Sequence, residues 1–235
     1  MKKSLGLYIH IPFCISKCAY CDFCSFPDAD GAVMSAYATE ICRRMREAAS
    51  LCSDYSVDTV YFGGGTPTLL PISDFEALVS CVVSSFTLSP NAEISAECNP
   101  ASADLSYLCS LRRIGVNRLS IGLQSVHDRE LRLLGRAHTF SDFCKLYGDA
   151  RSAGFDNVSA DLMYGIPDQT LDSFRESLRT LADMRPEHVS AYGLKIETGT
   201  PFFTMNERGR LALPDEDTEY EMYLSCSEIL GEAGY

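Results

Sequence analysis

Six short β-prone runs, each followed by an amphipathic stretch of helical period, constrain the fold of this chain more than any other feature. Strands are expected at 5–11, 57–62, 92–97, 117–123, 156–162 and 188–196, and helices at 32–50, 71–86, 102–114, 139–153, 170–183 and 214–231. Regular alternation of strands and helices is typical of parallel βα units. Because no Gly/Ser linker interrupts the pattern, residues 1–235 are expected to form a single domain.

The side-chain alternation within these runs distinguishes an open doubly wound sheet from a barrel. One face of the runs is polar, with Tyr8 and His10, Glu93, Ser95 and Glu97, Arg118, Ser120, Gly122 and Gln124, and Asn157, Ser159 and Asp161. A doubly wound sheet is covered by helices on both sides and should be apolar on both faces. The sequence therefore predicts an α/β fold, a partial (β/α)6 TIM-like barrel with helices outside and a polar, ligand-sized lumen inside.

Three cysteines follow the first predicted strand with the spacing C-x3-C-x2-C, at Cys14, Cys18 and Cys21. Three thiolates on one loop can hold three irons of a [4Fe–4S] cluster and leave the fourth iron open for a small chelating molecule. A zinc site is an alternative, but zinc normally takes four ligands in two separated pairs. Cys24 could complete four ligands only in an unusually tight loop, and incidental cysteines remain a third interpretation. The spacing favours the cluster.

The other cysteines and the charge bear on the cellular setting. The chain has 11 cysteines, and those outside this loop are interpreted as small buried hydrophobic residues. With no cleavable signal sequence after Lys2-Lys3, a reducing cytoplasm is expected. No apolar run is long enough for a transmembrane segment. The net charge of −12 argues against a nucleic-acid partner, since phosphate binding needs a basic surface.

Seven ordered motifs along the chain resemble radical SAM proteins of the coproporphyrinogen-oxidase type. They are YIHIPFCISKCAYCDF (8–23), FGGGTPT (62–68), AECNP (96–100), NRLSIGLQS (117–125), LGRAH (134–138), DLMYGIP (161–167) and ETGTPF (197–202). The resemblance covers nearly the whole chain. It implies the radical SAM barrel, a [4Fe–4S] cluster and S-adenosylmethionine (SAM) bound to the open iron, where a reduced cluster cleaves the sulfonium C–S bond.

The resemblance also implies which residues bind these cofactors. The cluster would be held by Cys14, Cys18 and Cys21. SAM would be contacted by Gly64, Gly65 and Thr66 in the glycine turn and by Glu97, Gln124, Arg136 and Asp161, with Tyr8 and Tyr20 nearby. From the residues alone, the glycines could form a tight βα turn. The two carboxylates could equally serve structural salt bridges or solvated strand ends.

Two branches of the family differ in function. The coproporphyrinogen dehydrogenase removes carboxyl groups from propionates by radical oxidation, and it carries an N-terminal extension and a further cysteine two residues after its third ligand. Here that position is Phe23, the additional cysteine is Cys24, and the first strand begins at about residue 5. These departures favour the heme-chaperone branch, with the dehydrogenase as the alternative, so whether the chain is an enzyme depends on the branch. The implied partners are heme or a porphyrinogen, a reducing electron donor and a heme-accepting protein.

The end of the chain departs from both branches. Relatives continue beyond the position of Tyr235 into a C-terminal domain that helps to bind the porphyrin, so that domain is expected to be missing here. The overall negative charge means that any tetrapyrrole site must be local. Arg129, Arg132 and Arg136 form the only small basic cluster near the predicted rim, and a solvated helix face is the favoured interpretation of the first two.

Overall fold

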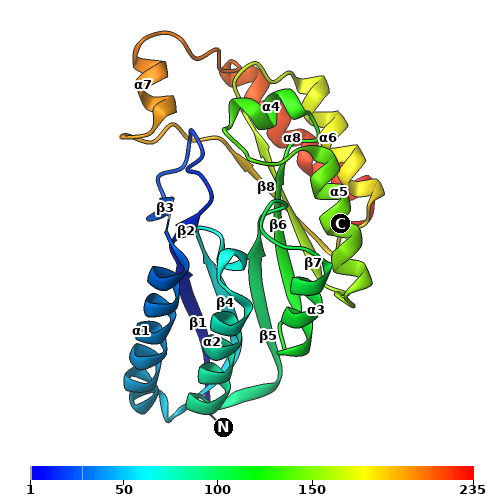
Figure 1. Ribbon diagram of the computed structural model, residues 1–235. Helices are drawn as coiled ribbons and strands as arrows, with labels where there is room; N and C mark the ends of the chain where they lie inside the picture. Colours follow the sequence, from blue (N-terminus) through cyan, green and yellow to red (C-terminus); the bar gives the residue numbers. More distant parts are fainter. Residues whose placement is uncertain (1, 28) are drawn as a thin grey trace.

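Six parallel strands form one curved sheet in the computed structural model, which describes residues 2–27 and 29–235 (Figure 1). The strand order is β1-β4-β5-β6-β7-β8. The strands are β1 (Lys3–Ile11), β4 (Tyr55–Gly64), β5 (Leu88–Cys98), β6 (Arg118–Gln124), β7 (Val158–Tyr164) and β8 (His188–Gly193). Since β1 and β8 are the two ends of this order, the sheet is an open half-barrel, as the sequence predicted.

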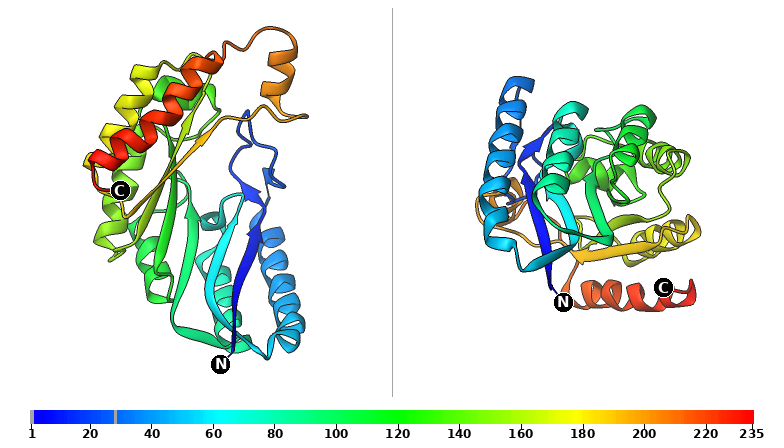
Figure 2. Two further views of the ribbon diagram at one scale, coloured as in Figure 1. Left: turned by 180° about the vertical axis from the view of Figure 1, so that it is seen from behind. Right: turned by 90° about the horizontal axis from the view of Figure 1, so that it is seen from below.

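Helices follow the strands, and most of them lie along the outer face of the sheet (Figure 2). They are α1 (Gly31–Ala49), α2 (Ile72–Ser85), α3 (Leu105–Arg113), α4 (Asp128–Leu133), α5 (Phe140–Ser152), α6 (Leu171–Asp183), α7 (Pro201–Glu207) and α8 (Glu216–Glu232), with one-turn 3₁₀ helices η1 (Ser50–Cys52) and η2 (Pro67–Leu69). The last helix, α8, packs along α6 and contacts β7 and β8. None of these helices is long and apolar enough to cross a membrane.

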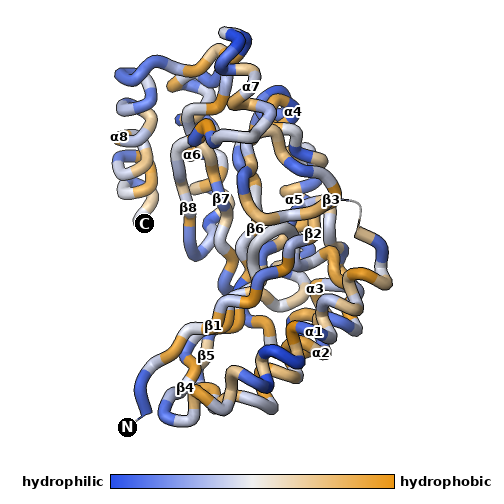
Figure 3. The backbone as a smooth tube through the Cα atoms, turned by 90° about the vertical axis from the view of Figure 1, so that its left-hand side faces the viewer, coloured by the Kyte–Doolittle hydropathy of each residue, from blue (hydrophilic) through white to orange (hydrophobic). Residues whose placement is uncertain are grey.

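The hydrophobic core fills the space between the sheet and the outer helices. Its fully buried large side chains include Phe62, Phe75, Leu119, Ile121, Phe143 and Phe174. Burying a side chain of this size stabilises the fold by roughly 1.5–3 kcal/mol. The helices are amphipathic in the way this packing requires, and α1 alternates hydrophobic and hydrophilic residues along its length (Figure 3). The apolar face of the strands is therefore turned outward, and the polar face is left for the lumen.

Several local features differ from the sequence prediction. The last strand ends at Gly193 rather than at 196. The third helix begins at Leu105 rather than at 102, because the side chain of Asp104 caps it by accepting a hydrogen bond from Tyr107 N. Ser102 lies in the turn before the helix, where its hydroxyl donates to Asn99 O at 2.7 Å. The short helices α4 and α7 and the two-stranded pair β2 (Phe13–Cys14) and β3 (Phe26–Pro27) were not predicted, since segments this short carry little periodicity.

Candidate functional site

A cavity of about 500 Å³ lies on the polar face of the sheet, beneath the loop that follows β1. Its walls come from the carboxyl ends of the parallel strands, which meet at one rim of the half-barrel, and from the cysteine loop. Eleven of the twelve residues predicted for the cofactor site line it, namely Cys14, Cys18, Tyr20, Cys21, Gly64, Gly65, Thr66, Glu97, Gln124, Arg136 and Asp161. The structure therefore gathers residues that are more than 140 positions apart in the sequence.

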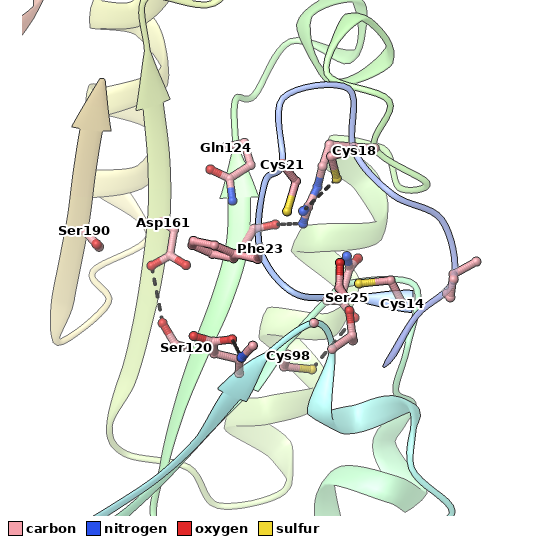
Figure 4. A pocket seen from close by; sticks show the side chains of 18 of the residues that line it. Cys14, Cys18, Cys21, Phe23, Ser25, Cys98, Ser120, Gln124, Asp161 and Ser190 are labelled. Carbon is pink, nitrogen blue, oxygen red and sulfur yellow. Dashed lines mark hydrogen bonds between the residues drawn. The ribbon is translucent and has the colours of Figure 1, made fainter. Parts of the chain in front are cut away.

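The three cysteines lie on one side of the cavity, across from Asp161 and Ser190 (Figure 4). The loop that carries them is tied to the barrel by backbone bonds, with Phe26 N donating to Pro12 O at 2.6 Å and Ala19 N to Leu134 O at 3.0 Å. Burial raises the pKa of the Cys21 thiol, and the neighbouring Cys18 and Cys14 add to this effect while the Phe23 backbone opposes it. A bound metal centre would offset that shift, because metal ligation requires the thiolate.

The glycine turn at the end of β4 brings backbone very close to the first strand and its loop. Gly64 has φ of +118°, and a Cβ on it would come within 2.4 Å of the His10 ring. A Cβ on Gly65 would come within 2.5 Å of Phe13 O. Any side chain at either position would displace the wall that carries Cys14, which explains why glycine is needed at both positions.

Glu97 is the best-anchored carboxylate of the cavity. It accepts hydrogen bonds from Tyr61 Oη at 3.0 Å and from Gly64 N at 2.9 Å. Burial raises its pKa, and the two hydrogen bonds partly oppose this increase. A buried carboxylate held in place by two donors is a suitable partner for a cationic group of a ligand.

Asp161 lies on β7 next to Ser120, whose hydroxyl donates to its Oδ1 at 3.3 Å. Burial, with a further contribution from the charge of Glu97, raises the pKa of Asp161 to about 6. The two carboxylates therefore destabilise each other in the cavity. Hydroxyl donors or a positive charge from a ligand would relieve this repulsion.

Arg136 is held at the rim by a backbone carbonyl rather than by a carboxylate. Its Nη2 donates to Gly122 O at 2.9 Å, and its Nη1 lies 3.8 Å from Cys18 Sγ. Its Nε is buried and has no partner among the described residues. Gln124 lies at the end of β6, the strand that contains Gly122. It has φ of +72° and accepts a hydrogen bond from Tyr192 Oη at 2.8 Å. Hydrogen bonds therefore hold both of these cavity-lining side chains in place.

Tyr8 is the one predicted site residue that does not line the cavity. Its ring is 60% exposed and stacks on Tyr61 with a centroid distance of 6.1 Å, and its hydroxyl lies 3.1 Å from His10 Nδ1. Tyr20, in contrast, lies within the wall, where burial raises the pKa of its phenol. Tyr8 is therefore placed to support Tyr61 behind the site, and its contact with SAM stays a prediction.

Several lining residues were missed by the sequence reasoning. They include Ser25, Tyr61, Ser190 and Tyr192. Cys98, which the sequence predicted to be buried, is buried and also lines the cavity. Tyr61 lies on the second predicted strand, and Ser190 and Tyr192 on the sixth, so extending the alternation used for the other strands would have found them. Ser25 lies in a loop without periodicity, and its buried hydroxyl has no partner in the part of the chain that the structure describes. Burial raises the pKa of Cys98 to about 11, so it stays a thiol at neutral pH.

Comparison with known proteins agrees with this geometry. The family described as "Radical SAM superfamily" matches residues 8–181, which is most of the chain. The chain belongs to the radical SAM superfamily. Membership implies a [4Fe–4S] cluster and SAM as cofactors, and it favours the cluster over the zinc site that the cysteine spacing alone had left open.

Curated relatives extend the match to both ends of the chain. The mouse "Radical S-adenosyl methionine domain-containing protein 1, mitochondrial" is 37% identical over 98% of this chain and 52% of its own length. The "Heme chaperone HemW" of Mycobacterium tuberculosis is 35% identical over 99% and 60%, and that of Escherichia coli 34% identical over 98% and 60%. The chain thus spans little more than half the length of these relatives.

A solved structure shows the same architecture. Coproporphyrinogen III oxidase (HemN) from Escherichia coli, described as a radical SAM enzyme, superposes with a TM-score of 0.89 at 28% identity. The match covers 100% of this chain and 54% of that one. The archaeal Elp3 of Methanocaldococcus infernus, at 15% identity and a TM-score of 0.66, shows the fold alone. These matches confirm the predicted fold class.

The cavity fits the implied cofactors. Three soft thiol ligands lie on one loop, and two unpartnered buried polar atoms, Ser25 Oγ and Arg136 Nε, belong to cavity-lining residues. Within residues 2–27 and 29–235, no group of three or more His, Cys, Asp or Glu side chains converges as the ligands of a single metal ion would. Thiolates of a [4Fe–4S] cluster each bind a different iron, so they need not converge in this way.

Proposed function

We propose that this chain is the cluster- and SAM-binding core of a heme chaperone of the HemW type. The observation that carries the proposal is Phe23, which lines the cavity at the position where the dehydrogenase branch has a further cysteine. The relatives named heme chaperones support it, because their similarity runs across nearly the whole chain. On this proposal the protein takes up heme and passes it to an acceptor protein.

The residues of the cavity would hold the cofactors in a defined arrangement. Cys14, Cys18 and Cys21 would bind three irons of the cluster, and Glu97, fixed by Tyr61 and Gly64, would accept hydrogen bonds from the ammonium group of SAM. The reduced cluster supplies the electron that cleaves SAM when both are bound. The contribution of the protein is to orient these groups and exclude water.

The mouth of the cavity has the apolar character that a flat macrocycle requires. Ile15 is 47% exposed and Phe23 is 64% exposed, and both line the cavity beside Tyr20 and Tyr192. Exposed large apolar side chains gathered at a cavity mouth are typical of a binding site. Phe23 and Ile15 would pack against the porphyrin ring, and truncating them should weaken heme binding.

A coproporphyrinogen dehydrogenase is the alternative, favoured by the TM-score of 0.89 with the Escherichia coli HemN structure. The two functions share the cluster and SAM but differ in what happens to the tetrapyrrole. A chaperone binds heme in a fixed ratio and leaves the ring unchanged, whereas a dehydrogenase consumes SAM as it converts propionates.

One experiment separates the two. The anaerobically reconstituted chain is incubated with hemin in one set and with coproporphyrinogen III, SAM and dithionite in another, and bound and converted tetrapyrrole are measured. The proposal predicts saturable heme uptake near one per chain with no porphyrinogen conversion, and a weaker uptake by Phe23→Ala than by the exposed control Leu51→Ala. Conversion of coproporphyrinogen without heme uptake would establish the alternative.

A further inference from the structure

The end of the cavity at the amino ends of β6, β7 and β8 is polar and has no place in the cofactor site described above. Strand pairing sets Ser95 opposite Arg118, and in the next row it sets Ser120, Ser159 and His188 side by side. Alternate residues of a strand face the same side, so Arg118 faces the lumen together with this row. Arg118, Ser159 and His188 all line the cavity. We call these three residues the Arg118 subsite.

Arg118 is a half-buried cation whose charge acts on Asp161 from a distance but which makes no direct ion pair in the described part of the chain. Its Nη1 donates to Ser95 Oγ at the long distance of 3.4 Å, while that hydroxyl itself donates to Glu93 at 2.8 Å. Among the described residues, no carboxylate forms an ion pair with Arg118. A guanidinium carries several N–H donors, so most of its hydrogen-bonding capacity is directed to the cavity.

The nearest carboxylates on the lumen face are already engaged. Glu97 is bound by Tyr61 and Gly64, and Asp161 by Ser120. The other groups of the subsite are a hydroxyl and an imidazole, with Ser159 Oγ 2.8 Å from His188 Nδ1. The subsite therefore combines one cation with hydroxyl and imidazole groups, which is the chemistry that recognises an anion.

The Arg118 subsite lies toward the amino ends of the strands, away from the cysteine loop. Arg118 begins β6 and Gln124 ends it six residues further on, a strand length of about 20 Å. Glu97 lies between these two levels, since it pairs with Ser120 in the row of Ser159. A carboxylate bound at Arg118 would therefore lie on the side of Glu97 that faces away from the cysteines.

We propose that the Arg118 subsite binds a carboxylate of the protein's ligand, which is a propionate if the ligand is a tetrapyrrole. This inference rests on the proposed function, since it assigns one end of the same ligand. The planar guanidinium can make two parallel hydrogen bonds to a carboxylate. With a net charge of −12 the protein has no general attraction for an anion, so recognition depends on a local cation such as this one.

The test compares hemin with hemin dimethyl ester, which keeps the macrocycle but has no propionate charge. Each of the two ligands is titrated into the reconstituted wild-type chain, into Arg118→Gln and into the control Arg113→Gln. Arg113 is exposed on α3, and its side chain makes no hydrogen bond to another described residue. Hemin affinity should fall at least about tenfold in Arg118→Gln, as expected for a lost hydrogen-bonded ion pair. Ester affinity should be unchanged, and Arg113→Gln should match the wild type with both ligands.

A second variant keeps the arginine and fills the subsite instead. Asn157→Asp adds a carboxylate beside Arg118 on the neighbouring strand, since Asn157 directly precedes Val158, which pairs with Leu119. It should also weaken hemin binding and spare the ester. Equal hemin affinity in wild type and both variants would overturn the inference while leaving heme binding intact, and so would an equal loss for hemin and ester. If the wild-type chain binds neither hemin nor coproporphyrin III, the proposed function fails and the subsite assignment fails with it.

Discussion

Tyr61 on β4 donates its phenolic hydrogen to Glu97 on β5 across 3.0 Å, at the centre of the cavity wall. The contact depends on Gly63, where a Cβ would come within 2.8 Å of the Tyr61 ring and 3.0 Å of Glu97 Oε1. The phenol lowers the pKa of a carboxyl group that burial raises. Tyr61 is therefore a positioning residue for Glu97.

Replacing Tyr61 by Phe should weaken SAM binding by about tenfold, because a hydrogen bond to a charged group is lost. The pKa of Glu97 should also rise further. As the pH is lowered, Glu97 should therefore become protonated, and SAM affinity should fall, at a higher pH than in the wild type. The measurement is calorimetric titration of SAM into the reconstituted protein at several pH values. Tyr55→Phe, on the same strand outside the cavity, is the control. Unchanged affinity and pH dependence would show that Tyr61 has no such role.

Asp161 should make the ligand-free chain less stable as the pH rises. Its pKa is raised from 3.8 to about 6 in the fold, so the folded state binds the proton more tightly than the unfolded state. The resulting stabilisation is complete below the pKa of Asp161 in the unfolded state, and it is lost as the pH rises through the pKa of Asp161 in the folded state. The loss is about 3 kcal/mol at most.

Asp161→Asn removes this ionisation. In urea unfolding it should be more stable than the wild type at pH 7 by up to about 3 kcal/mol, with the difference shrinking toward pH 4. Asp156→Asn is the exposed control on the preceding loop and should show no such trend. A constant difference across this range would contradict the assigned shift.

Gly122→Ala should separate ligand binding from stability. A Cβ there would lie 2.9 Å from Arg136 Nη2 and 3.1 Å from Gln124 Nε2. Both are ends of side chains, so they can move at small cost, and unfolding stability should change by less than about 1 kcal/mol. SAM affinity should fall severalfold because Arg136 and Gln124 are displaced. Gly148→Ala, which has open space around its Cβ, should leave SAM binding unaffected.

Glu130 should matter for stability rather than chemistry. Its buried carboxylate accepts from Ser125 Oγ at 2.6 Å, Ser173 Oγ at 2.8 Å and Gln169 Nε2 at 3.0 Å, which joins α4 to the loops after β6 and β7. Glu130→Ala would leave these donors without a partner and should cost about 3 kcal/mol in urea unfolding. Glu176→Ala, on the exposed face of α6, should cost little, and an equal effect of the two would contradict this assignment.

The sheet and most of the site could be predicted from the sequence because each depends on a periodic signal. Alternation within the strands showed which face was polar, and the lumen does contain Ser120, Ser159 and Asp161. The cysteine spacing and the motifs located most of the other residues that line the cavity. A prediction based on strand ends was able to find Glu97 and Asp161, since parallel strands present their carboxyl ends at one rim.

The rest depends on contacts between segments distant in sequence. The position of Ser25 follows from β2–β3 pairing, in which Phe13 lies opposite Phe26, and no pattern in the loop indicates that pairing. Arg118 was assigned only to the polar face, because its lack of a direct ion pair with any described residue is visible only once its neighbours are in place. The basic cluster expected at the rim does not act as one unit, since Arg129 pairs with Asp168 and Arg136 lines the cavity.

The central claim is that the loop of Cys14, Cys18 and Cys21 holds a [4Fe–4S] cluster with one iron open to SAM. The measurement is EPR spectroscopy of the anaerobically reconstituted, dithionite-reduced chain with and without SAM, alongside iron and sulfide analysis. We expect about four irons and four sulfides per chain and a signal that shifts when SAM is added. The signal should be lost in Cys14→Ala and kept in Cys109→Ala, because Cys109 lies on α3 outside the cavity. The sequence had predicted Cys109 and Cys144 to be buried, but both are exposed in the structure. A colourless protein that holds zinc, or a cluster signal indifferent to SAM and to Cys14→Ala, would contradict the account.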